Sequence, residues 1–249
     1  MEQPPDAVPF RQEPVMRTLS PIPSSPSSTG RTAGSGGTGR WARTGSRAVP
    51  AAIGTAVAAI AAADLVNPQY SPVTEVISRY VNGTAGWLVT TALFLVAGAS
   101  GLLLALLRRA GAPRVGRWAV GVWAAGIAVA GVFPADPPGR WGRPSTSDIV
   151  HGMAATPAFL ALPVAALVLH GWLTRRWTRG AGALRAVLGT SLVSTAVLLV
   201  CLVDVMDGPS LGTDAVPTLV GLVERIAFGA GLAWVALAAV AASRPAVRA

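Results

Sequence analysis

The side chains in this sequence that could take part in chemistry lie beside long apolar stretches. Carboxylates and imidazoles can transfer protons or coordinate a metal ion, and a guanidinium can form an ion pair with a carboxylate where water is scarce. On this basis we select one candidate ligand-binding set, a polar pocket. It consists of Asp64, Asp148, His151, Asp204, Glu224 and Arg225.

Arg225 is the permanent cation of this set, and it needs a partner if it lies within a membrane-spanning helix. Asp64 and Asp204 each lie at the C-terminal end of an apolar stretch, where the negative end of a helix dipole disfavours a carboxylate. We therefore expect Arg225 to pair with at least one of Asp64, Asp204 and Glu224. In the simpler alternative, Glu224 and Arg225 only lie at the membrane interface.

A metal site could combine His151 with Asp64, Asp204 or Glu224, which are ligand types that suit zinc or another divalent ion. The signal is weak, because the sequence contains no HExxH motif, no cysteine pair and no P-loop. We therefore assign no metal, no cofactor and no catalytic residue. Two structural explanations also stay open: Asp148 as a helix N-cap and His151 as a hydrogen-bonded structural residue.

Six apolar stretches must position these side chains. Each is close to the roughly 20 residues that a helix needs to cross the hydrocarbon core. They are Ala48 to Val66, Gly86 to Leu107, Trp118 to Phe133, Ile149 to Leu173, Ala186 to Val203 and Thr218 to Ala242. The sequence therefore predicts an all-α fold, a polytopic integral membrane protein with a six-transmembrane-helix bundle and a short amphipathic outer helix.

The loops between the stretches alternate between arginine-rich and acidic. Most of the 20 basic residues, all of them arginine, lie on one side, as Arg108, Arg109, Arg175 and Arg176 do. Cytoplasmic loops retain such charges, so we expect a multi-pass protein of the cell membrane with both termini cytoplasmic and the candidate set near the outer face. The net charge of +9 then reflects contact with membrane lipids and not with nucleic acid. A protein partner and a homo-oligomer stay open.

The N-terminal part of the chain differs in composition from the rest. Residues 1–47 are rich in Pro, Ser, Gly and Arg and show no apolar periodicity. Such a segment buries too little apolar surface to offset its ordering entropy. We therefore expect a disordered cytoplasmic tail at 1–47, a transmembrane domain at 48–243 and a short cytoplasmic C-terminus at 244–249.

The first acidic-side loop has a helical pattern. Ser71 can cap a helix with Pro72 at its first position, and Asn82-Gly83 supplies a stop. Glu75 and Arg79 fall on the face opposite the apolar stripe. The stripe comprises Val73, Val76, Ile77, Tyr80 and Val81. The spacing predicts a short amphipathic helix that packs onto the bundle or the lipid interface.

This loop also carries a resemblance. The run from Asn67 to Gly83, followed by Gly86-Trp87-Leu88, resembles the first outer loop of a large prokaryotic family of six-span membrane proteins, domain of unknown function 998. Three further pieces fit the same family: Gly131 to Asp136, Asp148 to Gly152 and Gly221 to Arg225. The resemblance covers about residues 48 to 243. It implies a six-span fold and no reaction, because the activity of the family is unknown.

Three function classes follow. The absence of strong catalytic motifs favours a non-enzymatic envelope protein whose outward-facing polar pocket binds a lipid headgroup, a small ligand or a partner protein. The second class is a small-solute transporter or channel component. The third is a membrane-embedded, metal-assisted hydrolase that uses His151 and the outer carboxylates.

Overall fold

The structure, a computed structural model, describes residues 35–140, 142–207, 212–213 and 216–245. The side chains of residues 35–43 and 207 lie outside this description. The predicted tail falls outside it over residues 1–34, as does the C-terminus over residues 246–249. The unit from Ser35 to Ala249 contains the helices.

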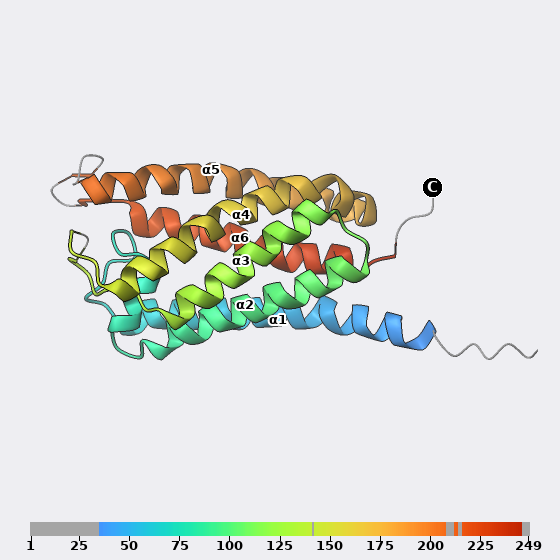
Figure 1. The fold of residues 1–249 in the computed structure, drawn as a ribbon, viewed down its shortest axis with the longest axis horizontal. Helices are drawn as coiled ribbons and strands as arrows, with labels where there is room; N and C mark the ends of the chain where they lie inside the picture. The colour runs from blue at the N-terminus through green and yellow to red at the C-terminus, as the bar shows by residue number, and fades with distance from the viewer. Residues whose placement is uncertain (1–34, 141, 208–211, 214–215, 246–249) are drawn as a thin grey trace, which may run out of the picture. The chain divides into compact units, whose positions relative to one another are not determined.

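Six α-helices make up this unit, and the described residues contain no β-strand (Figure 1). They are α1 (Ser35–Val66), α2 (Trp87–Arg109), α3 (Arg114–Val132), α4 (Thr146–Arg176), α5 (Ala181–Asp207) and α6 (Val220–Ala242), with 3-10 helices η1 (Ile77–Asn82) and η2 (Thr178–Gly180). Each α-helix contains a segment long and apolar enough to cross a membrane. The predicted all-α fold of a multi-pass membrane protein is confirmed.

Helix α1 begins earlier than the sequence suggested. It starts at Ser35, whereas residues 35–47 were predicted to belong to a disordered tail. The apolar, membrane-spanning part of the helix starts at Thr44. Once a helix is nucleated, each further residue adds a hydrogen bond at little cost. The helix therefore extends past its apolar segment into residues that give no apolar signal of their own.

Helix α6 forms the centre of the bundle. It packs against α1, α2, α4 and α5, and α3 packs mainly on α4 and α2. In α6, 56% of the apolar span is buried inside the bundle, whereas the buried share is at most 39% in any other span. The helices approach closely where glycine faces a neighbour: a Cβ on Gly126 would lie 2.6 Å from the backbone oxygen of Ala154. Small residues allow such contacts between membrane helices.

An aromatic cluster joins the helices at mid-bundle. The ring centroids of Trp123 on α3, Phe159 on α4 and Phe228 on α6 lie 5.8–6.0 Å apart. The indole N–H of Trp123 donates to Ser100 Oγ of α2 at 2.9 Å. The hydrogen bond satisfies the buried indole donor. The cluster forms an aromatic floor beneath the polar residues at one end of the bundle.

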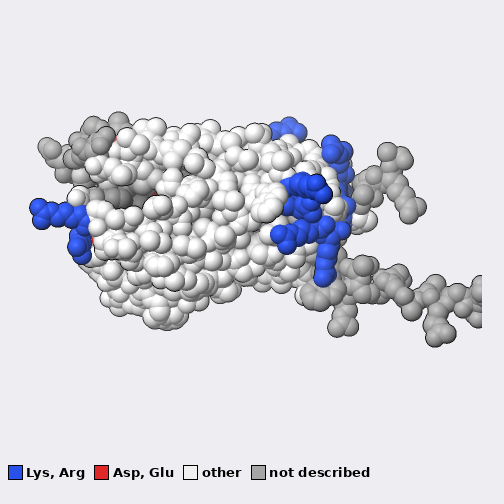
Figure 2. All heavy atoms as spheres, viewed as in Figure 1, with Lys and Arg blue, Asp and Glu red and all other residues white. Residues whose placement is uncertain are grey.

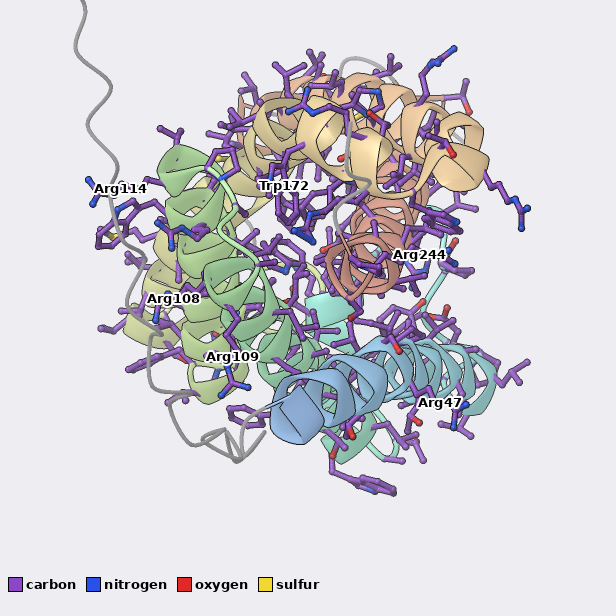
Figure 3. The ribbon with its side chains drawn as sticks, turned by 90° about the vertical axis from the view of Figure 1, so that its right-hand side faces the viewer. Arg47, Arg108, Arg109, Arg114, Trp172 and Arg244 are labelled. Carbon is purple, nitrogen blue, oxygen red and sulfur yellow. The ribbon has the colours of Figure 1, made fainter. Side chains whose placement is uncertain are left out.

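The two ends of the bundle differ in charge. Arginine side chains gather at one end, which contains the α2–α3 and α4–α5 connections and the end of α6 (Figures 2 and 3). We call it the arginine-rich end. Arg47, Arg108, Arg109, Arg114 and Arg244 are seen there together in Figure 3. The α1–α2 and α3–α4 connections, the end of α5 and the start of α6 lie at the opposite end, here called the loop end.

Candidate functional site

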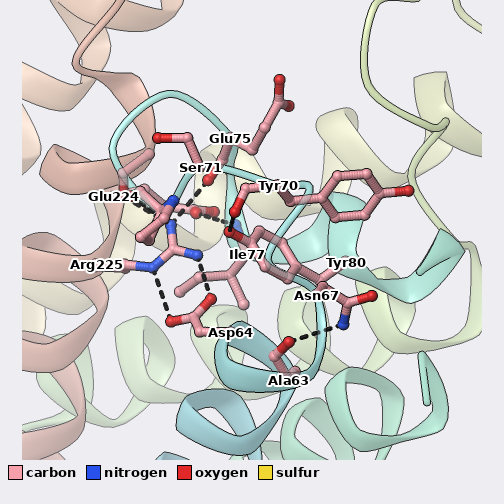
Figure 4. A network of polar contacts seen from close by, with 12 residues as sticks. Ala63, Asp64, Asn67, Tyr70, Ser71, Glu75, Ile77, Tyr80, Glu224 and Arg225 are labelled. Carbon is pink, nitrogen blue, oxygen red and sulfur yellow. Dashed lines mark hydrogen bonds and ion pairs between the residues drawn. The ribbon is translucent and has the colours of Figure 1, made fainter. Parts of the chain in front are cut away.

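The α1–α2 connection, residues 67–86, is held at its base by Asn67. This side chain is fully buried. Its Nδ2 donates to the carbonyls of Ala63 at 2.7 Å and Thr84 at 2.9 Å, and its Oδ1 accepts from the Thr84 amide and from Gln69. A buried amide with all of its hydrogen bonds made specifies one geometry. Asn67 therefore holds the second half of the connection, at Thr84, against the end of α1 (Figure 4).

The predicted helix from Ser71 to Val81 is wrong in its first half. Residues 71–75 form turns, and only η1, from Ile77 to Asn82, is helical, in the 3-10 form. The predicted stop at Asn82-Gly83 is confirmed, because Gly83 is the C-cap of η1. The stripe was a valid signal of an apolar face: Val76, Ile77 and Tyr80 are all buried.

The cause of this difference is that α6 takes the backbone groups an α-helix would use. The Val73 carbonyl accepts from the Leu222 amide at 3.0 Å, and the Ile77 amide donates to Glu224 Oε2 at 2.5 Å. In an α-helix these two groups would bond to each other. The first turns of α6 therefore replace helical hydrogen bonds in the connection with bonds between elements.

Arg225 completes this contact. Its Nη1 donates to the carbonyls of Pro72 at 2.9 Å, Glu75 at 2.8 Å and Gly221 at 3.1 Å. Its Nη2 and Nε donate to the two carboxylate oxygens of Asp64 at 2.6 and 3.3 Å, a bidentate ion pair (Figure 4). The guanidinium carbon lies 5.1 Å from the ring centroid of Tyr80. The predicted pairing of Arg225 with one of the three acids is confirmed, and the partner is Asp64.

A second arginine of this region, Arg79, belongs to η1 and is buried. Arg79 was predicted on the polar face, but the residue is only 1% exposed. Its Nη1 donates to the Pro137 carbonyl at 3.4 Å and lies 4.0 Å from Glu75 Oε2. Burial lowers the pKa of Arg79, and Glu75, Asp148 and Asp136 oppose this effect. Arg79 therefore belongs to an acidic cluster that includes these three carboxylates.

Two of these carboxylates hold the α3–α4 connection. Asp136 Oδ2 accepts from the Ser145 amide at 2.6 Å, and this hydrogen bond is the main reason why the pKa of Asp136 is lowered. Asp148 Oδ1 accepts from the Asp136 amide at 3.2 Å. The prediction that Asp148 is the N-cap of this helix is wrong. Ser145 is the N-cap, its hydroxyl accepts from the Asp148 amide, and Asp148 is left free to face the connection.

His151 lies one turn deeper in α4 and is buried. Its Nδ1 is 3.0 Å from the Ala130 carbonyl and 2.9 Å from the Phe133 carbonyl. Carbonyls only accept, so Nδ1 carries the hydrogen and, in the neutral ring, Nε2 carries the lone pair. The predicted hydrogen-bonded structural role of His151 is therefore present, and Nε2 is the ring nitrogen left to contact a ligand.

A cavity of about 730 Å³ opens between α4 and α5 in the half of the bundle nearest the loop end. Its polar lining includes Arg79, Asp148, His151 and Glu224, and its apolar walls come from α4 and α5. The apolar wall residues include Ile149, Met153, Phe159, Leu198, Leu202 and Met206. Pockets that bind small ligands have this size and this mixture of apolar walls with few polar groups.

The structure divides the candidate set. Asp148, His151 and Glu224 line the cavity, whereas Asp64 and Arg225 form the ion pair that holds the α1–α2 connection. Asp204 is buried on α5 and is not a lining residue. Within the described ranges, no three His, Cys, Asp or Glu side chains are grouped so that they could hold a metal ion.

Sequence reasoning missed Arg79 as a member of the site. One signal was available: Glu75 and Arg79 are four residues apart, and Arg79 is a cation in a loop on the acidic side. Both features suit a solvent-exposed helical pair equally well. Only the packing of the α3–α4 connection over η1 distinguishes the two cases.

These observations place the protein in the class of six-span helical membrane proteins. A comparison of sequences identifies the family within this class. A family model described as "Protein of unknown function (DUF998)" matches residues 50–241. The chain belongs to this family, as its loop motifs suggested. No curated protein and no solved structure matches it.

Proposed function

We propose that this protein binds an amphiphilic lipid in the α4–α5 cavity, with the polar head at the loop end and the hydrocarbon chain between the two helices. The observation that carries the proposal is the cavity itself, which joins polar side chains at one end to apolar walls. The proposal includes an orientation, in which the arginine-rich end faces the cytoplasm and the cavity lies in the outer leaflet.

The dimensions of the cavity support a lipid chain. Its α4 lining runs from Asp148 to Phe159. At 1.5 Å per residue these positions span about 16 Å of helix axis, which is close to half of the roughly 30 Å hydrocarbon core. A ligand that reaches from the polar end to the aromatic floor would therefore cross about one leaflet.

The exposed side chains at the mouth of the cavity support entry from the membrane. Met153 is 73% exposed and Ile149 48% on α4, and Met206 is 74% exposed and Val203 60% on α5. All four line the cavity. Methionine adapts its shape to varied apolar surfaces. A chain that enters between α4 and α5 would stay in contact with apolar groups throughout.

Photolabelling tests the proposal. An uncharged amphiphile with a diazirine in its alkyl chain is added to protein in a neutral detergent, and labelled peptides are identified by mass spectrometry. We expect labelling of residues 148–159 and 195–206, saturable by the same amphiphile without the diazirine. Gly152→Phe should abolish it, because Gly152 lines the cavity and a Cβ there meets no atom within 4 Å, so the ring projects into the space.

Gly189→Phe on α5 is the matched control. Gly189 is exposed, its Cβ would also meet no atom within 4 Å, and it does not line the cavity. Labelling should be unchanged in this variant. Unsaturable labelling spread evenly over the outward faces of all helices, or labelling that survives Gly152→Phe, would mean that the cavity binds no amphiphile.

A further inference from the structure

The polar lining of the cavity contains more acidic than basic side chains. Arg79 is the basic residue among the described lining residues, and Asp148 lines the cavity and acts on that guanidinium. Glu224 adds a carboxylate that lines the cavity beside Ser78 and His151. Among the described residues, two acidic side chains, Asp148 and Glu224, therefore line the cavity beside one arginine, and Arg225 does not line it.

The atoms that a ligand can reach are mainly hydrogen-bond acceptors. Arg79 lines the cavity but is only 1% exposed, and its Nη1 already donates to the Pro137 carbonyl. Asp148 uses Oδ1 for the Asp136 amide, and Glu224 uses Oε2 for the Ile77 amide, which leaves one carboxylate oxygen of each for a ligand. His151 Nδ1 donates to two carbonyls, so Nε2 of the neutral ring is a further acceptor.

We propose that the cavity selects amphiphiles with a cationic, hydrogen-bond-donating head, such as a primary ammonium, over amphiphiles with an anionic head. This inference rests on the proposed lipid-binding function and specifies its ligand class. An ammonium group offers three donors to the free carboxylate oxygens and Nε2, and it balances the excess negative charge. A phosphate or carboxylate head would bring further acceptors and a like charge.

Competition against the photolabel tests this preference. Hexadecylamine, hexadecanol and hexadecyl phosphate share one chain and differ in the head. Each is titrated into neutral-detergent micelles as a mole fraction, and labelling of residues 148–159 is measured. We expect hexadecylamine to displace the label at about a tenfold lower mole fraction than hexadecanol, which corresponds to about 1.4 kcal/mol, and hexadecyl phosphate to be the weakest competitor.

Two isosteric variants and one control complete the experiment. Asp148→Asn and Glu224→Gln each keep the oxygen that accepts the backbone amide, so the fold is retained while the charge is removed. Each should reduce the advantage of hexadecylamine over hexadecanol by at least about threefold, or about 0.65 kcal/mol. Asp204→Asn removes a buried carboxylate that does not line the cavity and should keep the full advantage.

The outcomes separate this inference from the proposed function. If all three competitors displace the label but hexadecyl phosphate equals or exceeds hexadecylamine, the charge preference is wrong and lipid binding stands. If the advantage of hexadecylamine survives in both isosteric variants, the preference does not come from these carboxylates and the inference is again wrong. If none displaces the label, the proposed function fails as well.

Discussion

The guanidinium of Arg225 joins three segments that are far apart in the sequence. It pairs with Asp64 of α1, donates to two carbonyls of the α1–α2 connection and caps a carbonyl within its own helix. The side chains of Arg225 and Asp64 are 16% and 26% exposed, so water screens the pair only in part. Its geometry serves to hold the connection, and it does not project into the cavity.

Arg225→Met should therefore destabilise the protein more than Asp64→Asn. The first change strands a carboxylate and the carbonyls of Pro72 and Glu75, which we expect to cost about 3–5 kcal/mol, while the second keeps an acceptor for the guanidinium and should cost about 1–2 kcal/mol. Unfolding of both single variants and the double variant is followed by denaturant titration in detergent.

The double variant should be less destabilised than the sum of the two single variants, because the loss of either partner removes the same ion pair. Strict additivity together with a harmless Arg225→Met would mean that Arg225 only extends toward lipid headgroups.

At the scale of elements, the α1–α2 connection and the first turns of α6 act as one unit. One backbone hydrogen bond links Leu222 to Val73, and the Glu224 carboxylate accepts from the amide of Ile77. This contact requires close backbone approach at Gly221, where a Cβ would lie 2.4 Å from the Glu75 carbonyl oxygen. The Gly221 to Arg225 motif is thus explained by its contact with residues 72–77.

Gly221→Ala should loosen this contact while the bundle stays folded. The added methyl group meets a backbone atom that cannot rotate away, so the connection must move from α6, at a cost of about 1–3 kcal/mol. Hydrogen exchange measures the effect: the amides of Ile77 and Leu222 should lose protection, and amides in the middle of α2 and α6 should keep it.

Gly229→Ala is the control for this substitution. It lies in the same helix, and a Cβ there would meet no atom within 4 Å. It should leave the exchange of Ile77 and Leu222 unchanged. Equal protection of both amides in the Gly221→Ala protein would show that the connection tolerates the methyl group and is not held by close contact.

At the scale of the whole molecule, the charge asymmetry of the two ends predicts the orientation in the membrane. The arginine-rich end should be cytoplasmic. Single cysteines are introduced into a Cys201→Ser background, which removes the one native thiol. In intact cells, a membrane-impermeant maleimide should label a cysteine at Gly142, and it should label cysteines at Arg108 and Arg175 only after the cells are permeabilised. All three positions are exposed.

The reverse labelling pattern would show that the protein has the opposite orientation in the membrane, with the α4–α5 cavity in the inner leaflet. The lipid-binding proposal would survive in that case, since it depends on the cavity, but its ligand would come from the cytoplasmic leaflet. A cysteine at Gly182 provides a further check at the arginine-rich end, because this residue is exposed and a Cβ there meets no atom within 4 Å.

The positions of the spans and the difference in charge between the two ends follow from the sequence alone. Length and apolarity are local properties, so the six membrane-spanning helices could be located, although α1 begins at Ser35 and not at Ala48. The buried stripe of the α1–α2 connection could also be recognised. The polar partner of Arg225 could be narrowed to three acids, because each of them, like Arg225, lies near the predicted outer end of its span.

The identity of the acid that pairs with Arg225, and of the residues that form the cavity, depends on the tertiary structure. Asp64 and Arg225 are 161 positions apart, and their contact depends on how α1 and α6 rotate and pack against each other. The burial of Arg79 and the space between α4 and α5 depend likewise on contacts between distant segments. Such contacts leave no local periodicity in the sequence, because the energy that selects them comes from the packing of the whole bundle.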